Sequence, residues 1–141
     1  MTDTSPIALS AKDAALAALA LLAALEPEPE ESLAAFLPVC PQLDAGRAFF
    51  IVPLITDMAS APDGVEAVLE LIADALPPAM AATAYLLAAE FVSAWGTHLP
   101  EQMRLLERLG EALKLDRLTR AALDSAALAR SQSLDEEAEA L

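Results

Sequence analysis

Basic residues are scarce in this sequence. Of its 141 residues, 8 are lysine or arginine and 22 are aspartate or glutamate, which gives a formal net charge of −14. A chain without a basic stripe has little to neutralise phosphates, so we expect neither nucleic-acid binding nor attachment to an anionic membrane. The charge either attracts a cation or a basic protein partner, or keeps an apolar chain soluble.

Cysteine and histidine each occur once, as Cys40 and His98. A single cysteine excludes an intrachain disulfide and fits a reducing compartment. Cys40 is either a small buried hydrophobe or a redox-active thiol, depending on its pKa. A lone histidine without ligands at metal spacing is rarely a metal site. Because we find no nucleophile–base pair and no phosphate-binding loop, we expect no enzyme activity and no cofactor.

Long hydrophobic runs are also missing, although 56% of the residues are hydrophobic. The uncharged runs cover residues 14–25 and 75–89, and both are shorter than the roughly 20 apolar residues that a membrane-spanning helix needs. The first residues lack the positive charge that typically opens a signal peptide. We therefore expect a cytoplasmic protein without a membrane segment.

Alanine and leucine, which favour helices, dominate what is present. The patterns predict an all-α protein, a compact bundle of about seven helices. We expect a single domain over residues 1–130 and an acidic, flexible tail over 131–141. The helix starting near residue 10 is apolar on nearly every side, which predicts a central, buried helix.

Local signals mark where the other helices begin and end. Pro29 and Pro100 suit the first turns of two helices, and Pro53 predicts a kink or a break inside a third. We expect Leu118, Ala122 and Ala126 to lie in register on the last helix. Helix-capping side chains are expected at four positions, which are Ser10, Asp44, Asp63 and Asp116.

A shift of 71 residues places Pro29-Glu30-Glu31 over Pro100-Glu101-Gln102. Each triplet follows a long apolar segment and opens a shorter helix. This correspondence suggests a pseudo-twofold internal repeat, or else arises by chance.

Three stretches of the second half carry a family resemblance. They are Ala94-Trp95-Gly96-Thr97-His98-Leu99-Pro100-Glu101-Gln102, Leu105-Leu106-Glu107-Arg108-Leu109 with Leu113, and Leu115-Asp116-Arg117-Leu118-Thr119. With these stretches, residues 63–130 resemble the tellurite-resistance TerB-like family. The resemblance implies a bundle of about seven helices, in which a loop aspartate and a pair of glutamates at a helix start form a cation site. Here Trp95 stands in place of that aspartate and Gln102 in place of the second glutamate.

Two functions follow as expectations. The first is a non-enzymatic TerB-like helical protein that acts as a protein-interaction module in a stress or tellurite-resistance context. Its partner surface would include Trp95 and His98, although Trp95 alternatively packs into the vacated site; homo-oligomers also remain open. The second is a divalent-cation binding protein, because hard cations need several converging oxygens. Its candidate metal ligands are Glu26, Glu28, Glu30, Glu31 and Glu101.

Overall fold

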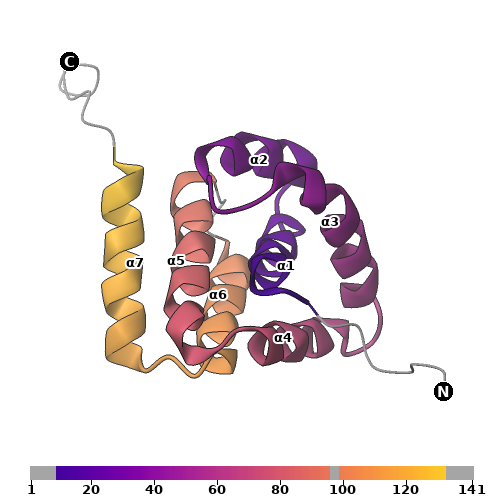
Figure 1. The fold of residues 1–141 in the computed structure, drawn as a ribbon. Coiled ribbons are helices and arrows are strands. Elements are labelled where there is room, and N and C mark those ends of the chain that lie inside the picture. Colours follow the sequence, from indigo (N-terminus) through magenta and orange to yellow (C-terminus); the bar gives the residue numbers. More distant parts are fainter. Residues whose placement is uncertain (1–8, 96–98, 133–141) are drawn as a thin grey trace, which may run out of the picture.

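The computed structural model describes residues 9–95 and 99–132 of the chain, and these form an all-helical bundle (Figure 1). The predicted all-α class is confirmed, with seven α-helices and no strand in this part of the chain. The elements are α1 (Ala11–Ala23), α2 (Pro29–Phe36), the 3₁₀ turn η1 (Leu37–Val39), α3 (Ala45–Ala59), α4 (Gly64–Ala75), α5 (Pro78–Trp95), α6 (Pro100–Ala112) and α7 (Arg117–Ser131).

Helix α1 forms the centre of the bundle, as its composition predicts. Of its 13 residues, 11 are buried, and the helix contacts α2, α3, α4, α5 and α6. Figure 1 shows α1 enclosed by these helices. Its alanines leave little side-chain bulk, so the surrounding helices can approach its backbone closely.

Three of the four predicted capping side chains are confirmed. The Asp13 amide donates to Ser10 Oγ at 3.1 Å, and the Gly46 amide donates to Asp44 Oδ1 at 2.9 Å. The Thr119 amide donates to Asp116 Oδ1 at 2.7 Å. Each bond satisfies an amide of the first helical turn that has no partner within the helix.

The predicted cap at Asp63 is wrong. Asp63 precedes α4 but makes no capping bond with its side chain. Its φ is 58°, in the left-handed region, whereas a capping residue normally has an extended backbone. The tight turn between α3 and α4, in which the Gly64 amide donates to Ala61 O at 2.8 Å, imposes this conformation.

The break considered at Pro53 does not occur, because α3 runs through it from Ala45 to Ala59. Pro53 is exposed, so the carbonyl that loses its amide partner can bond to water. Ile51 and Ile55 on the opposite side are buried and hold both halves of the helix on the core.

Helix α7 lies at the edge of the bundle beside α5 (Figure 1). The predicted seventh helix contains Leu118, Ala122 and Ala126 four residues apart, but all three are exposed, and the fully buried residue of the helix is Ala127. Polar contacts set its rotation instead. Tyr85 Oη donates to Asp124 Oδ1 at 2.8 Å, and Arg130 pairs with Glu90.

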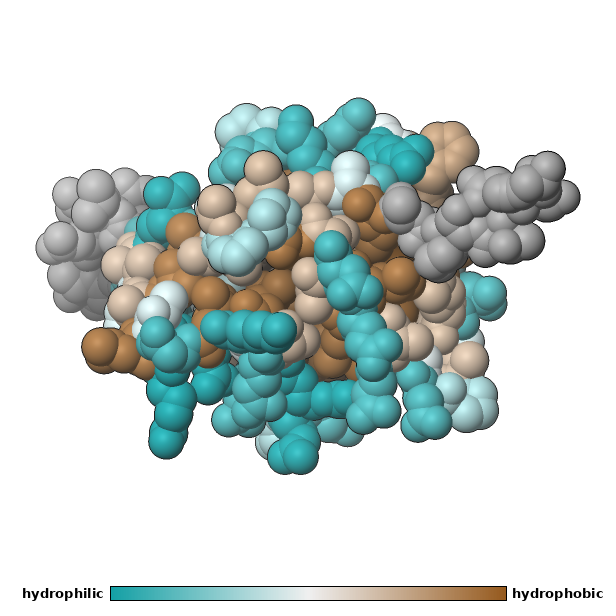
Figure 2. Space-filling view, turned by 60° about the horizontal axis from the view of Figure 1, so that its bottom comes forward, coloured by the Kyte–Doolittle hydropathy of each residue, from teal (hydrophilic) through white to brown (hydrophobic). Residues whose placement is uncertain are grey.

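The surface mixes apolar and charged areas. Figure 2 shows apolar residues across the middle of one face, between groups of hydrophilic side chains. No described helix is long and apolar enough to cross a membrane.

The internal repeat stays a prediction. Pro29 and Pro100 do begin α2 and α6, and each helix follows a largely buried apolar one. The matched positions differ in environment, however, because Glu31 is exposed and Gln102 is fully buried.

Candidate functional site

An acidic groove lies between the start of α2 and the second half of α3. It encloses about 830 Å³. None of its nine lining residues is basic, and four are acidic. The lining residues are Glu28, Pro29, Glu30, Glu31, Val52, Pro53, Thr56, Asp57 and Ser60.

Three of the four acids of the groove lie at the start of α2, and the fourth, Asp57, lies on α3. Pro29 opens α2, and Glu30 and Glu31 occupy its first turn, where the helix dipole favours negative charge. A hydrogen bond between the side chains of Glu28 and Glu31 raises the pKa of Glu31 above its ordinary value. Carboxylates crowded in this way favour the approach of a positive group.

Two phenylalanines project into solvent next to this groove. Phe49 and Phe50 are 83% and 70% exposed. They lie four and three residues before Pro53, a lining residue of the groove, and such residues are neighbours on a helix surface. The chain has only four phenylalanines, so half of them face water.

The other two phenylalanines show the usual environment. Phe36 and Phe91 are buried and meet edge to face, with ring centroids 5.5 Å apart. The contrast marks Phe49 and Phe50 as surface groups outside the core. An exposed aromatic pair is costly in water, and large exposed apolar groups often mark interaction sites.

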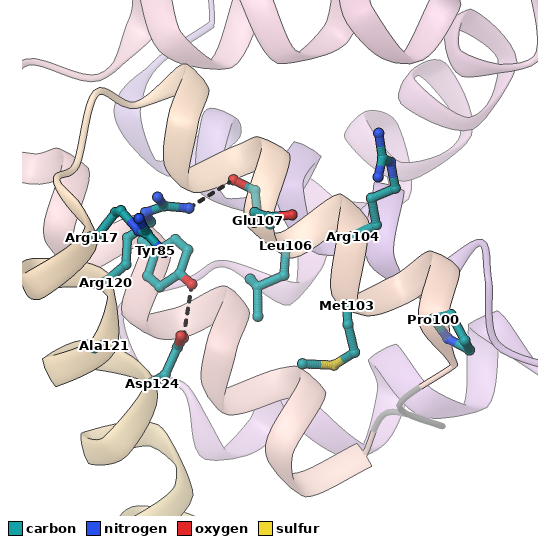
Figure 3. Close-up of a pocket in the computed structure, with 10 residues that line it drawn as sticks. All are labelled: Tyr85, Pro100, Met103, Arg104, Leu106, Glu107, Arg117, Arg120, Ala121 and Asp124. Carbon is teal, nitrogen blue, oxygen red and sulfur yellow. Dashed lines mark hydrogen bonds between the residues drawn. The ribbon is translucent and has the colours of Figure 1, made fainter.

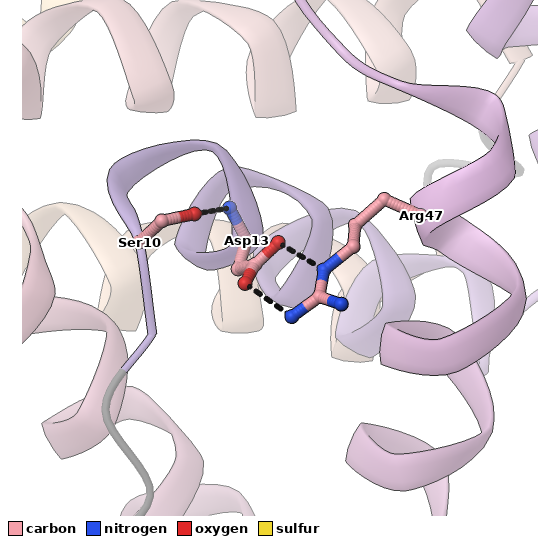
Figure 4. A network of polar contacts seen from close by, with 3 residues as sticks. All are labelled: Ser10, Asp13 and Arg47. Carbon is pink, nitrogen blue, oxygen red and sulfur yellow. Dashed lines mark hydrogen bonds and ion pairs between the residues drawn. The ribbon is translucent and has the colours of Figure 1, made fainter.

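An ion pair between α1 and α3 fixes the start of α3 and thereby the aromatic pair. Arg47 Nε and Nη2 each donate to a carboxylate oxygen of Asp13 at 3.0 Å (Figure 4). This bidentate contact with Arg47 is the main cause that lowers the pKa of Asp13. The Arg47 guanidinium carbon also lies 6.0 Å from the centroid of the Phe50 ring, within the range of a cation–π contact.

The five predicted metal ligands do not converge. Glu28, Glu30 and Glu31 line the acidic groove, Glu101 lines a different groove beside Arg104, and Glu26 is buried. No group of three or more histidine, cysteine, aspartate or glutamate residues that could hold a metal ion occurs among the residues described.

Gln102 has a structural contact that its place in the sequence did not reveal. Its Nε2 donates to Glu26 Oε2 at 2.6 Å and to Leu22 O at 3.1 Å. The Gln102 side-chain amide therefore joins the start of α6 to the end of α1. The site is buried, and a hydrogen bond is electrostatically stronger there than in water. A glutamate at this position would bring two carboxylates together.

The remaining predicted residues differ in their placement. Trp95 is 41% exposed, beside Phe36 and Arg130 at the end of α5, and its role with a partner stays a prediction. His98 lies outside the described residues. Cys40 is buried, and this burial is the main cause that raises the pKa of its thiol, which disfavours the reactive thiolate.

A second groove, of about 520 Å³, lies between α5, α6 and α7 (Figure 3). Burial is the main cause that raises the pKa of Tyr85, and its bond to Asp124 adds to the shift. The phenol thus stays protonated and offers no base. Arg120 Nη1 donates to Glu107 O at 3.4 Å, and its chain fits because Gly110 has no Cβ to meet Arg120 Cδ.

Phe49 and Phe50 were not among the residues singled out from the sequence. A usable signal was present. Adjacent residues on a helix are about 100° apart, and the buried positions Ala48, Ile51 and Ile55 already follow helical spacing. The two phenylalanines fall outside that stripe.

No protein-family model, curated protein or solved structure matches this chain. The assignment of its function therefore rests on the residues described above.

Proposed function

We propose that this protein is a non-enzymatic interaction module that binds a basic, amphipathic segment of another protein on the α2–α3 surface. The observation that carries the proposal is the exposed pair Phe49 and Phe50 beside an acidic groove. Aromatic side chains are enriched among the residues that contribute most to binding. The carboxylates supply attraction at long range and select positive partners.

The two parts of the surface specify different features of the partner. Apolar side chains of the partner would cover Phe49 and Phe50, which lose unfavourable contact with water. Lysines or arginines would lie over Glu28, Glu30 and Glu31, where no basic lining residue competes for them. A segment that carries both kinds of residue fits better than a purely basic or purely apolar one.

The setting of this module is a separate expectation. The resemblance over residues 63–130 supports a TerB-like protein of a cytoplasmic stress or tellurite-resistance system. Fold-level resemblance does not by itself fix function, so the binding surface is tested directly.

The probe is a fluorescently labelled helical peptide with lysines on one face and leucines on the other. Its affinity is measured by fluorescence anisotropy at several salt concentrations, and its position by amide chemical shifts of the labelled protein. We expect Phe49→Ser combined with Phe50→Ser to raise Kd at least about tenfold. Glu30→Gln combined with Glu31→Gln should raise Kd and reduce its salt dependence.

Matched substitutions outside the surface provide the controls. Glu70→Gln combined with Glu111→Gln removes the same charge elsewhere, and Met80→Ser removes an exposed apolar side chain. These variants should bind the peptide as the wild type does. Equal binding by the phenylalanine variant, or by a peptide with glutamate in place of lysine, would overturn the proposal.

Divalent-cation binding is the second candidate, favoured by the hydrogen bond that brings Glu28 and Glu31 together. A thermal melt with calcium, magnesium, manganese or zinc tests it, since a ligand at about 100 times its Kd stabilises by about 2.7 kcal/mol. We expect no saturable shift, because so few carboxylates converge. A shift abolished by Glu30→Gln with Glu31→Gln would place cation binding first.

A further inference from the structure

Three arginines make no ion pair within the described part of the chain, and all three line one groove. The chain has six arginines. Three of them pair with carboxylates, and these are Arg47, Arg108 and Arg130. The other three line the groove of about 520 Å³ between α5, α6 and α7, and these are Arg104, Arg117 and Arg120. We call it the arginine groove. Acids outnumber bases in this chain, so a gathering of unpaired arginines indicates a site for an anion.

Arg120 is held in the wall of the arginine groove with few partners for its charge. Its side chain crosses α6 at Gly110, where an added Cβ would clash with it. Its Nη1 donates one long hydrogen bond, of 3.4 Å, to Glu107 O. Its Nε is buried and has no hydrogen-bond partner among the described residues. Because a partly buried charge with so few bonds is unfavourable, an anion in the groove would stabilise this guanidinium.

The arginine groove is charged at one end and apolar at the other. Arg117 and Arg120 are three residues apart on α7, so they are neighbours on the helix surface. Figure 3 shows both of them beside Tyr85. Leu106 lies in the middle of the groove, and Met103, which is 43% exposed, lies toward the other end (Figure 3). A ligand with one charged end and one apolar end fits this order.

The charge of the lining favours a ligand with a single negative charge. Three arginines stand against two acids, Glu107 and Asp124, which leaves one positive charge. Asp124 already accepts a hydrogen bond from Tyr85, and Arg104 points away from the other two arginines (Figure 3). A polyanion would be repelled by the net charge of −14, whereas a single charge is repelled far less. A carboxylate carries one charge at neutral pH, and its two oxygens match the donors of an arginine.

We propose that the arginine groove binds a small monocarboxylate with an unbranched apolar chain. The carboxylate lies against Arg117 and Arg120, and the chain runs along Leu106 and covers the exposed side of Met103. The volume of about 520 Å³ falls within the range of about 300–1,000 Å³ that is usual for small-molecule sites. The site lies on other helices than the α2–α3 surface, so it adds a second binding activity to the proposed function.

Isothermal titration calorimetry with octanoate tests the proposal. Octanoate should bind saturably, and octan-1-ol, which has the same chain without the charge, should bind at least about tenfold more weakly. Affinity should rise from butyrate through hexanoate to octanoate, because each added methylene loses contact with water in the groove. The amide chemical shifts that change on binding should lie around Arg117 and Arg120 at the start of α7.

Variants of the lining residues test the position of each end of the ligand. Arg120→Gln should raise the Kd of octanoate at least about tenfold, and so should Arg117→Gln, which leaves the side chain at Gly110 in place. The matched control is Arg108→Gln, which removes the same charge from an arginine of α6 outside the groove, and it should leave Kd within about twofold. Met103→Ala should reduce the gain in affinity from butyrate to octanoate.

The absence of binding at millimolar octanoate overturns the proposal, as does equal binding of octan-1-ol. Equal weakening by Arg117→Gln, Arg120→Gln and Arg108→Gln also overturns it, because net charge alone would then explain the binding. Inorganic phosphate that binds as tightly as octanoate would overturn the assignment to an apolar monocarboxylate. Phe49→Ser with Phe50→Ser should leave octanoate binding unchanged, and weakening by that variant would place octanoate on the α2–α3 surface and overturn the site.

Discussion

Replacing Gln102 by glutamate should make the stability of this protein depend on pH. In the wild type, Gln102 Nε2 donates to Glu26 Oε2 at 2.6 Å and to Leu22 O at 3.1 Å in a buried site. In Gln102→Glu an acceptor oxygen takes the place of this donor and faces two other acceptors. Two buried carboxylates at this distance do not both ionise, so the pair retains a proton.

The magnitude follows from the proton uptake. Suppose that the pair in the folded variant titrates about 2 units above the ordinary glutamate pKa of about 4.3. The folded state then binds more protons than the unfolded state, and stability falls as pH rises between these two values. The penalty is about 2.6 kcal/mol at pH 7 and about 1 kcal/mol at pH 5, apart from a loss of about 1 kcal/mol for the missing donor.

Urea denaturation followed by circular dichroism at these two pH values measures the effect, and both lie above the pI of about 4.1. Gln102→Met is the control, because it removes the donor without adding a titratable group. Its loss of stability should change less between the two pH values than that of Gln102→Glu. If Gln102→Glu lost equal stability at both, the two carboxylates would not interact, and the reasoning would be refuted.

Three further predictions concern the stability and reactivity of the bundle. In the folded protein the pKa of Asp13 is lowered from its ordinary value of 3.8, chiefly by Arg47. The ionised pair therefore stabilises the fold fully above pH 3.8, and this stabilisation is lost as the pH falls through the lowered pKa of the folded state. Asp13→Asn should therefore cost about 1–2 kcal/mol in urea denaturation at pH 7 and less at pH 3; an equal loss at both would contradict this. Gly64→Ala should lower the unfolding free energy by about 2–3 kcal/mol, because the added Cβ would clash with the Met58 carbonyl oxygen. An unchanged melting temperature in a thermal melt would show that the turn can move to make room. The Cys40 thiol, buried and with a raised pKa, should react with Ellman's reagent much more slowly in the native protein than in denaturant, whereas equal rates would show that it is accessible.

The parts of the fold that follow from local signals could be predicted from the sequence. The apolar composition of α1 indicates its central place, and Pro100 marks where α6 begins. The left-handed φ of Asp63 follows from how α3 turns into α4, which no capping motif reveals.

The parts that depend on distant contacts could not be predicted. The rotation of α7 is set by the bond from Tyr85 to Asp124, 39 residues apart, and the environment of Gln102 by Leu22, 80 residues away. The candidate groove likewise requires α2 and α3 to be placed side by side, and the sequence alone gives no register between them.

The complete burial of α1 has a consequence for how the molecule opens. Its amides are covered by five other helices, so they should exchange with deuterium only when the whole bundle unfolds. Helix α7, with one fully buried residue, should open on its own at a lower free energy. The protein thus has a rigid centre and a separately opening edge.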